Sequence, residues 1–204
     1  RSFACSSPPE QAAKLIVASF ILLLAACSGG DEQAKVATKP NEPLTKSKNS
    51  PQFNQSFSQL TDAYFLLKEN FITENDTAII ATAKKLILAA DSLQLKELKA
   101  DSSIVETAKS FSQSLSAELK GLIGEKVLLQ KRKNFNVVTD LVYNLIRTVQ
   151  YDREVVYYQR CPMAFEEGDP NAFWLSKSSD IRNPYHPKTM LTCGEVVDSL
   201  KYIP

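Results

Sequence analysis

Four stretches of the chain repeat apolar residues at intervals of three and four, and this pattern constrains the fold more than any other feature. Such spacing places the apolar side chains on one face of a helix. Four amphipathic helices joined by short polar links favour an antiparallel four-helix bundle, so we expect a mainly α fold whose stripes form the core. The stripes are Phe53, Phe57, Leu60, Tyr64, Leu67 and Phe71; Ile79, Ala83, Leu86 and Ala90; Ile104, Ala108, Phe111, Leu115, Leu119 and Leu122; and Phe135, Val138, Val142, Leu145 and Val149.

The composition argues against most enzyme chemistries and against nucleic acid as a partner. The chain has 204 residues, of which 44% are apolar, enough for one domain with a hydrophobic core. Its net charge of +1 gives no general attraction to nucleic acid. His186 is the single histidine, which excludes a two-histidine zinc site. With no nucleotide-binding loop and no GxSxG motif, we expect a binding protein and not an enzyme.

The N-terminal region is predicted to be a targeting signal. Lys14 precedes the apolar run Leu15–Leu24, which is too short to span a bilayer but suits a secretory signal peptide. The residues after it, ending in Cys27, resemble the bacterial lipobox, in which cleavage precedes a cysteine that is then acylated. An ordinary cleavage site is the alternative. The residues ahead of Lys14 fit a signal peptide poorly, which indicates either a fragment or a start placed too early.

These features predict three parts: a signal peptide at 1–26, a flexible polar tether at 27–50 and a folded domain at 51–204. We expect a lipoprotein in the cell envelope of a Gram-negative bacterium, anchored to a membrane through Cys27 and facing the periplasm or the exterior. Within the domain, Lys131, Arg132 and Lys133 are interpreted as a solvated helix face. The segment 152–204 differs from the rest, since it begins with a predicted strand at 155–158 and is rich in turn formers.

All of the soft or borderline ligands of the mature chain other than Cys27 lie within this C-terminal segment, between residues 161 and 193. Pro162 favours an extended conformation at Cys161, so Met163 is expected to face the same way as Cys161. Met190 and Cys193 are three residues apart, which places both on one face of a helical turn. Thiolates and thioethers together select Cu(I) over harder cations. The predicted metal ligands are Cys161, Met163, Met190 and Cys193, with His186 as a fifth, optional ligand.

The same two cysteines allow a second interpretation without a metal. Thiols in an oxidising compartment usually pair, and a disulfide between Cys161 and Cys193 would contribute roughly 3 to 4 kcal/mol. The two methionines would then fill gaps in a small core. In this alternative the protein is a disulfide-stapled interaction domain.

The C-terminal segment carries four motifs: Tyr157-Tyr158-Gln159-Arg160-Cys161-Pro162-Met163-Ala164, Trp174-Leu175-Ser176, Ile181-Arg182-Asn183-Pro184-Tyr185 and Met190-Leu191-Thr192-Cys193-Gly194-Glu195. In these motifs it resembles a known bacterial family, the domain of unknown function 3347. The resemblance covers about residues 55–198 and is most specific in the last 45 or so, whereas the helical part matches in pattern. The family occurs in free-standing lipoproteins and on periplasmic adaptor subunits of copper and silver efflux pumps. Where this chain has His186, Pro187 and Lys188, family members more often show a glycine-containing turn.

The resemblance implies a helical domain with a C-terminal Cys/Met segment and a role near heavy-metal handling. We therefore expect a membrane-anchored metal-binding module that buffers Cu(I) or Ag(I), or delivers it to an efflux system. Trp174 and Tyr185 are expected to shield the site from water. The expected partners are the membrane, through acylated Cys27, and heavy-metal efflux proteins.

Overall fold

The computed structural model describes residues 48–166 and 171–203; the predicted signal peptide, Cys27 and most of the tether lie outside them. Within these ranges, the helices are α1 (Pro51–Ile72), α2 (Asp76–Asp91), α3 (Ser102–Gly124) and α4 (Leu128–Val149), with a short 3-10 helix η1 (Leu95–Glu97). The strands are β1 (Lys48–Asn49), β2 (Leu98–Lys99), β3 (Val156–Cys161), β4 (Ala172–Ser176) and β5 (Glu195–Leu200).

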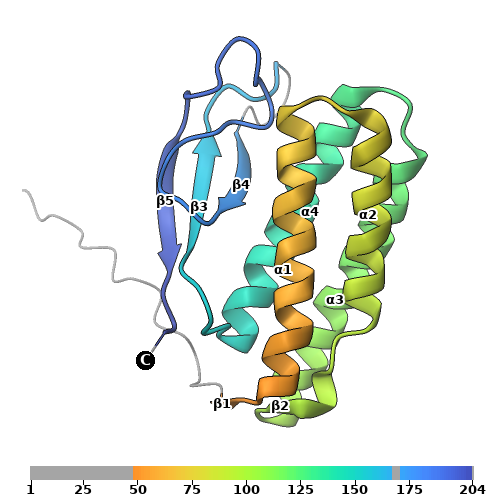
Figure 1. Ribbon diagram of the computed structural model, residues 1–204, viewed down its shortest axis with the longest axis vertical. Helices are drawn as coiled ribbons and strands as arrows, with labels where there is room; N and C mark the ends of the chain where they lie inside the picture. The colour runs from red at the N-terminus through yellow and green to blue at the C-terminus, as the bar shows by residue number, and fades with distance from the viewer. Residues whose placement is uncertain (1–47, 167–170, 204) are drawn as a thin grey trace, which may run out of the picture. The chain divides into compact units, whose positions relative to one another are not determined.

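The four helices coincide with the four periodic stretches, so the prediction of a mainly helical fold is confirmed. Each helix packs against the next one in the chain (Figure 1). Ser50 and Asn75 cap α1 and α2, because their side chains accept the backbone N–H of the third residue of the helix. Asp101 also precedes its helix, but its side chain makes no capping bond.

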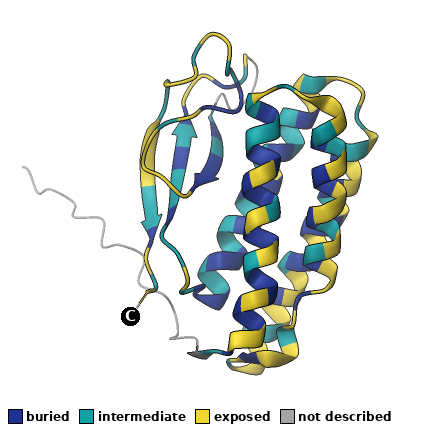
Figure 2. Ribbon diagram, viewed as in Figure 1, coloured by how far each residue is buried: buried dark blue, intermediate teal, exposed yellow. Residues whose placement is uncertain are grey.

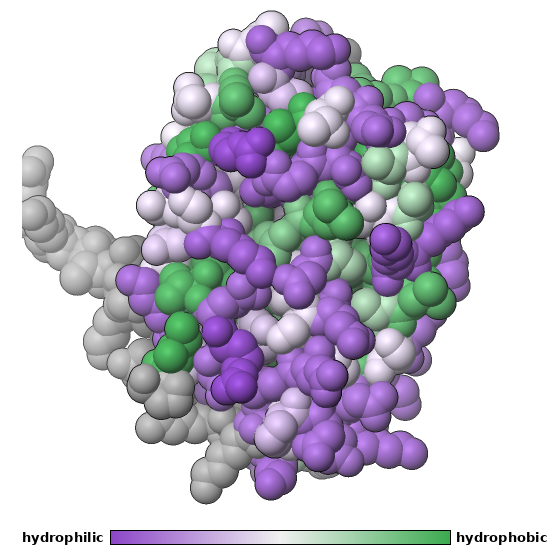
Figure 3. Space-filling model, in the orientation of Figure 1, coloured by the Kyte–Doolittle hydropathy of each residue, from purple (hydrophilic) through white to green (hydrophobic). Residues whose placement is uncertain are grey.

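The apolar stripes form the core, as the sequence pattern predicts. Buried residues lie on the inner side of the helices, while exposed residues mark their outer side (Figure 2). Phe135 of α4 stands at the centre, with its ring 4.6 Å from that of Phe71 and 5.6 Å from that of Tyr64. On the face that carries α1 and α2, apolar and polar side chains are interspersed (Figure 3). Among the described residues, no helix combines the length and apolar character needed to cross a membrane.

The segment after α4 contains two strands that the sequence analysis did not predict. β3 begins one residue later than expected, at Val156, and pairs with both β4 and β5 in an antiparallel sheet of order β4-β3-β5. β4 and β5 are separated by an irregular segment that covers one face of the sheet. At the other end of the helices, β1 pairs with β2, so Lys48 and Asn49 of the predicted tether form a strand.

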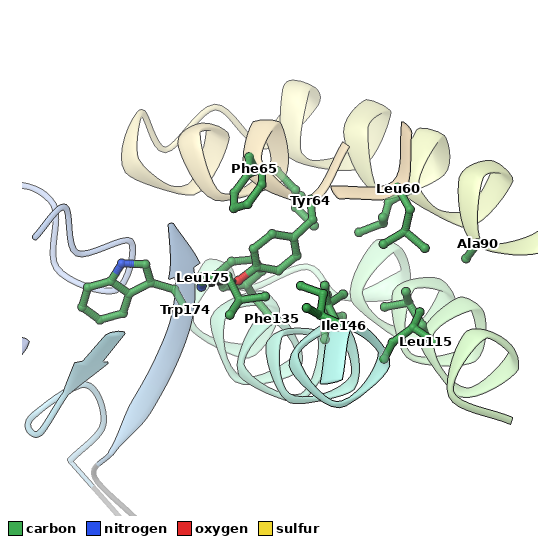
Figure 4. Packing of buried hydrophobic residues seen from close by; sticks show 14 of the residues in the cluster. Leu60, Tyr64, Phe65, Ala90, Leu115, Phe135, Ile146, Trp174 and Leu175 are labelled. Atoms are coloured by element: carbon green, nitrogen blue, oxygen red, sulfur yellow. Dashed lines mark hydrogen bonds between the residues drawn. The ribbon is translucent and has the colours of Figure 1, made fainter. Parts of the chain in front are cut away.

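The edge of the sheet formed by β4 is attached to the helices by hydrogen bonds. The backbone N–H of Leu175 donates to the hydroxyl of Tyr64 at 3.0 Å, and that hydroxyl also bonds Thr139 of α4 at 2.7 Å. The N–H of Phe173 donates to the Asn136 side chain at 2.7 Å. Figure 4 shows Tyr64 and Leu175 facing each other between strand and helices, with Trp174 on the other side of the strand.

The opposite edge, formed by β5, is irregular. Tyr158 pairs with Asp198 and Gln159 pairs with Val196, so Val197 is an extra residue that forms a β-bulge. Asp198 accepts a hydrogen bond from the backbone N–H of Ser199 at 2.7 Å and another from Tyr143 at 2.6 Å. These features interrupt the row of backbone groups that an edge strand presents.

The interpretation of 131–133 as a solvated face is wrong for its first two residues. Lys131 is 1% exposed and forms an ion pair with Asp76, at the start of α2. Arg132 donates to Glu74 at 3.0 Å and to the carbonyl of Pro184 at 3.0 Å. Because the first turn of α4 lies beside the α1–α2 turn, its basic side chains meet acidic partners there. The two ion pairs connect α4 to the start of α2 and to the α1–α2 turn, and the hydrogen bond to Pro184 connects α4 to the segment after β4.

We expect Tyr64→Phe to lower the free energy of unfolding by about 1–3 kcal/mol, since the buried N–H of Leu175 and hydroxyl of Thr139 both lose their partner. Urea denaturation measures the change. The control is Tyr157→Phe, at a half-buried tyrosine of β3, which we expect to change stability by less than about 0.5 kcal/mol. Equal losses in both variants would contradict the assigned role of the Tyr64 hydroxyl.

Glu74 predicts a pH dependence of stability. Hydrogen bonds from Lys188 and Arg132 hold the pKa of the Glu74 carboxyl below its usual value of 4.5. The stabilisation is therefore complete above the usual pKa and is lost as pH falls through the lower pKa of the folded state. We expect Glu74→Gln to be less stable than wild type at pH 7 and to approach it near pH 3. Exposed Glu97→Gln is the control, and parallel pH profiles for wild type and Glu74→Gln would overturn the prediction.

Candidate metal centre

Cys161 is the last residue of β3 and is fully buried. It pairs with Ala172 of β4, and Gln159 pairs with Trp174 in the same register. Because alternate residues of a strand share a face, Cys161 and Trp174 lie on the face of the sheet turned away from α4. Tyr158 and Phe173 occupy the other face, where their rings stack 4.9 Å apart and Tyr158 stacks on Tyr143 of α4.

Met163 lies differently from the expectation. The extended strand ends at Cys161, and Pro162 and Met163 form a turn. The turn breaks the alternation that would have aligned the two side chains: Cys161 is 0% exposed, whereas Met163 is 57% exposed. The chain then returns inward at Ala164, which is buried.

Met190 and Cys193 lie in a turn, as their spacing indicates. The backbone N–H of Cys193 donates to the carbonyl of Met190 at 3.1 Å, and both residues are half-buried. One turn earlier, the N–H of Met190 donates to the carbonyl of His186 at 2.8 Å. The second half of the predicted ligand set is therefore a short, hydrogen-bonded segment that leads directly into β5.

The structure brings the two halves of the set to one end of the sheet. Arg160 pairs with Glu195, so the next residues along each strand, Cys161 and Gly194, stand opposite each other. On the loop side, the His186 ring contacts the carbonyl of Ala164 at 3.0 Å. Cys193 thus lies at the same end of the sheet as Cys161.

The side chains are not assembled into a formed site. Within residues 48–166 and 171–203, no group of three or more His, Cys, Asp or Glu side chains is placed to hold a metal ion. Cys161 and Cys193 are both free thiols in the described structure. A metal coordinated by all four sulfur residues therefore requires the exposed Met163 to turn inward.

Gly194 permits the close approach of the two halves. Its φ of +148° lies in a region that residues with a side chain rarely adopt. A Cβ atom there would lie 2.7 Å from the carbonyl oxygen of Arg160, 2.8 Å from the Trp174 ring and 3.2 Å from Ile181. A side chain at this position would push Cys193 away from β3.

Trp174 and Tyr185, the residues predicted to shield the site, are both buried. They are 0% and 1% exposed, and their rings lie 6.2 Å apart. Tyr185 donates its hydroxyl to the carbonyl of Phe173, and burial raises the pKa of this hydroxyl well above its ordinary value. Both rings therefore stay uncharged and exclude water from the surroundings of Cys161.

Sequence reasoning missed two polar residues that order the segment. Asn183 is fully buried; its backbone N–H donates to Leu191 at 2.8 Å and its side chain donates to the carbonyl of Cys193 at 3.3 Å. The Gln159 side chain donates to the carbonyls of Ser178 and Asp180 at 3.0 and 3.2 Å. The signals available were an Asn before a proline and a Gln directly after the β-branched and aromatic residues of the predicted strand.

Gly194→Ala is expected to lower the free energy of unfolding by about 1–3 kcal/mol, because it combines an unfavourable φ with close contacts. Urea denaturation gives the stability, and the fluorescence of Trp174, the single tryptophan, reports the local displacement. Gly124→Ala, at the end of α3, is the matched control, since a Cβ there meets nothing within 4 Å. A neutral Gly194→Ala variant with unchanged fluorescence would show that the glycine is not required.

Comparison with known proteins supports a family assignment for the helical part. The family model described as "Protein of unknown function (DUF3347)" matches residues 60–154. The match begins within α1 and ends two residues before β3, so it covers the helices and not the Cys/Met segment. No curated protein and no solved structure matches the chain. Residues 60–154, slightly less than half of the chain, are thus similar to the DUF3347 family of proteins of unknown function.

Proposed function

We propose that this protein is a binding module for a soft monovalent metal ion, Cu(I) or Ag(I). The observation that carries the proposal is the pairing of Arg160 with Glu195, which brings Cys161, one residue after Arg160, and Cys193, two residues before Glu195, to the same end of the sheet. Residues 32 positions apart in sequence thereby supply thiols at one end of one sheet. Two thiolates and two thioethers match the preference of Cu(I) for soft ligands.

The exposure of the sulfur residues supports uptake from solution. Met163 is exposed, Met190 and Cys193 are half-buried, and Cys161 is fully buried. An ion would meet the exposed thioether first and reach the buried thiol last. Met163 would hold the ion as a neutral ligand that can be exchanged for a ligand of a partner protein, whereas the two thiolates would retain it. This gradation suits buffering, or delivery to an efflux system.

The remaining parts of the proposal concern the setting of the module. We infer that the four helices form an antiparallel four-helix bundle, which is supported by the contacts between consecutive helices and by the short turns that join α1 to α2 and α3 to α4. The lipobox-like sequence before Cys27 supports lipid anchoring in the cell envelope. A role in binding, and not in catalysis, agrees with the single histidine of the chain.

A competitive Cu(I) titration against a chromogenic chelator tests the proposal. The protein is the fully reduced chain with Cys5→Ser and Cys27→Ser, which leaves Cys161 and Cys193 as its thiols. We expect one Cu(I) per chain, and we expect Cys193→Ser to lose the ability to compete, because one of two anionic ligands is removed. Leu191→Ala is the matched control: it lies in the same turn, carries no sulfur and should bind as wild type does.

A thiol count on the protein as isolated separates this function from the alternative. Two reactive thiols after denaturation agree with a metal site. No reactive thiols, together with failure of the reduced protein to compete for Cu(I), would replace the metal site with a disulfide-stapled interaction domain.

A further inference from the structure

The side chain of His186 joins two segments that are far apart in sequence. Its Nε2 atom lies 3.0 Å from the carbonyl oxygen of Ala164. Because a carbonyl can only accept a hydrogen bond, Nε2 must carry the proton. Metal coordination requires the lone pair of an imidazole nitrogen, so Nε2 cannot be a ligand while this bond exists.

This hydrogen bond connects the two halves of the proposed site, the turn after Cys161 and the turn that leads to Cys193. Ala164 closes the turn that begins at Cys161, and it is 2% exposed. The backbone carbonyl of His186 accepts from Thr189 at 3.3 Å and from Met190 at 2.8 Å, which starts the turn toward Cys193. One residue thus contacts the first half through its ring and the second half through its backbone.

The backbone around His186 is held in place by neighbours outside the site. Two residues earlier, the carbonyl of Pro184 accepts from Arg132 of α4 at 3.0 Å. The Asn183 side chain accepts from the N–H of Tyr185 at 2.8 Å. Two residues later, Lys188 forms an ion pair with Glu74 in the α1–α2 turn. The contacts of Pro184, Tyr185 and Lys188 therefore fix the backbone that carries the His186 ring, and the ring reaches the segment that contains the more exposed turn at 162–163.

We propose that His186 is a positioning residue, whose Nε2–H fastens the Cys161–Ala164 turn to the Met190–Cys193 turn and is therefore not available to bind a metal. The consequence for metal capture rests on the proposed function. The fastening itself is a property of the metal-free chain. It holds the sulfur residues close enough that an ion bridging them need not first order both segments.

The test compares His186→Gln with His186→Ala in the reduced, metal-free Cys5→Ser, Cys27→Ser chain. The Gln amide can donate from near the position of Nε2, whereas Ala cannot. We expect His186→Ala to speed both amide exchange at 163–165 and labelling of the Cys161 thiol by roughly two- to tenfold, because this variant loses one hydrogen bond. Gln should stay near wild type. Thr189→Ala, at the exposed residue in the same turn, is the control and should change neither rate.

Trp174 fluorescence checks that each variant folds, and His186→Leu replaces Ala if that variant unfolds, since Leu keeps bulk without a donor. The proposal would be overturned if His186→Ala and His186→Leu both kept the wild-type rates of amide exchange and Cys161 labelling. It would also be overturned if His186→Gln accelerated these rates as much as His186→Ala does. In the Cu(I) titration, a positioning role predicts that Gln retains the affinity and Ala weakens it. An equal loss of Cu(I) affinity in His186→Gln and His186→Ala would instead indicate that His186 is a ligand.

The metal-free measurements also separate this inference from the proposed function. If neither the wild-type protein nor any variant competes for Cu(I), the proposed metal site is wrong. The exchange and labelling rates would still decide whether His186 fastens the two turns.

Discussion

The hydroxyl of Tyr64 is the point on which the arrangement of helices and sheet depends. It bonds Thr139 of α4 and accepts the N–H of Leu175, so one buried atom joins α1, α4 and β4. Burial raises the pKa of this hydroxyl far above its ordinary range, and the group stays protonated. An edge strand normally leaves its outer N–H groups to water. Here they end on helix side chains, so the sheet is attached to the helices in one register.

That attachment determines where the sulfur residues lie. With β4 fixed to the helices, β3 pairs with it and brings Cys161 beside Ala172, and β5 follows β3 with Gly194 opposite Cys161. The α1–α2 turn and the first turn of α4 hold the covering segment through Glu74 and Arg132. The family match ends ahead of these strands, so the proposal of metal binding rests on strand register and ligand chemistry, not on the family model.

The helices could be predicted because their information is local. The spacing of Phe53 to Phe71 identifies α1 without reference to any other part of the chain, and Asn75 marks the start of α2. β4 and β5 could not be predicted, because their partners are distant in sequence and short strands carry little periodicity. The burial of Lys131 was missed for the same reason: its partner, Asp76, lies 55 residues away. Likewise, the turn at Met163 follows from how the chain leaves β3, which spacing does not encode.

The two edges of the small sheet lead to a property of the protein at high concentration. One edge is occupied by Tyr64 and Asn136, and the other carries the bulge at Val197 beside Glu195 and Asp198. Extra residues and charges on an edge strand hinder the addition of a further strand. Crowded copies of this chain therefore have little opportunity to grow into a shared β-sheet. The sheet supports its loops without acting as a template for aggregation.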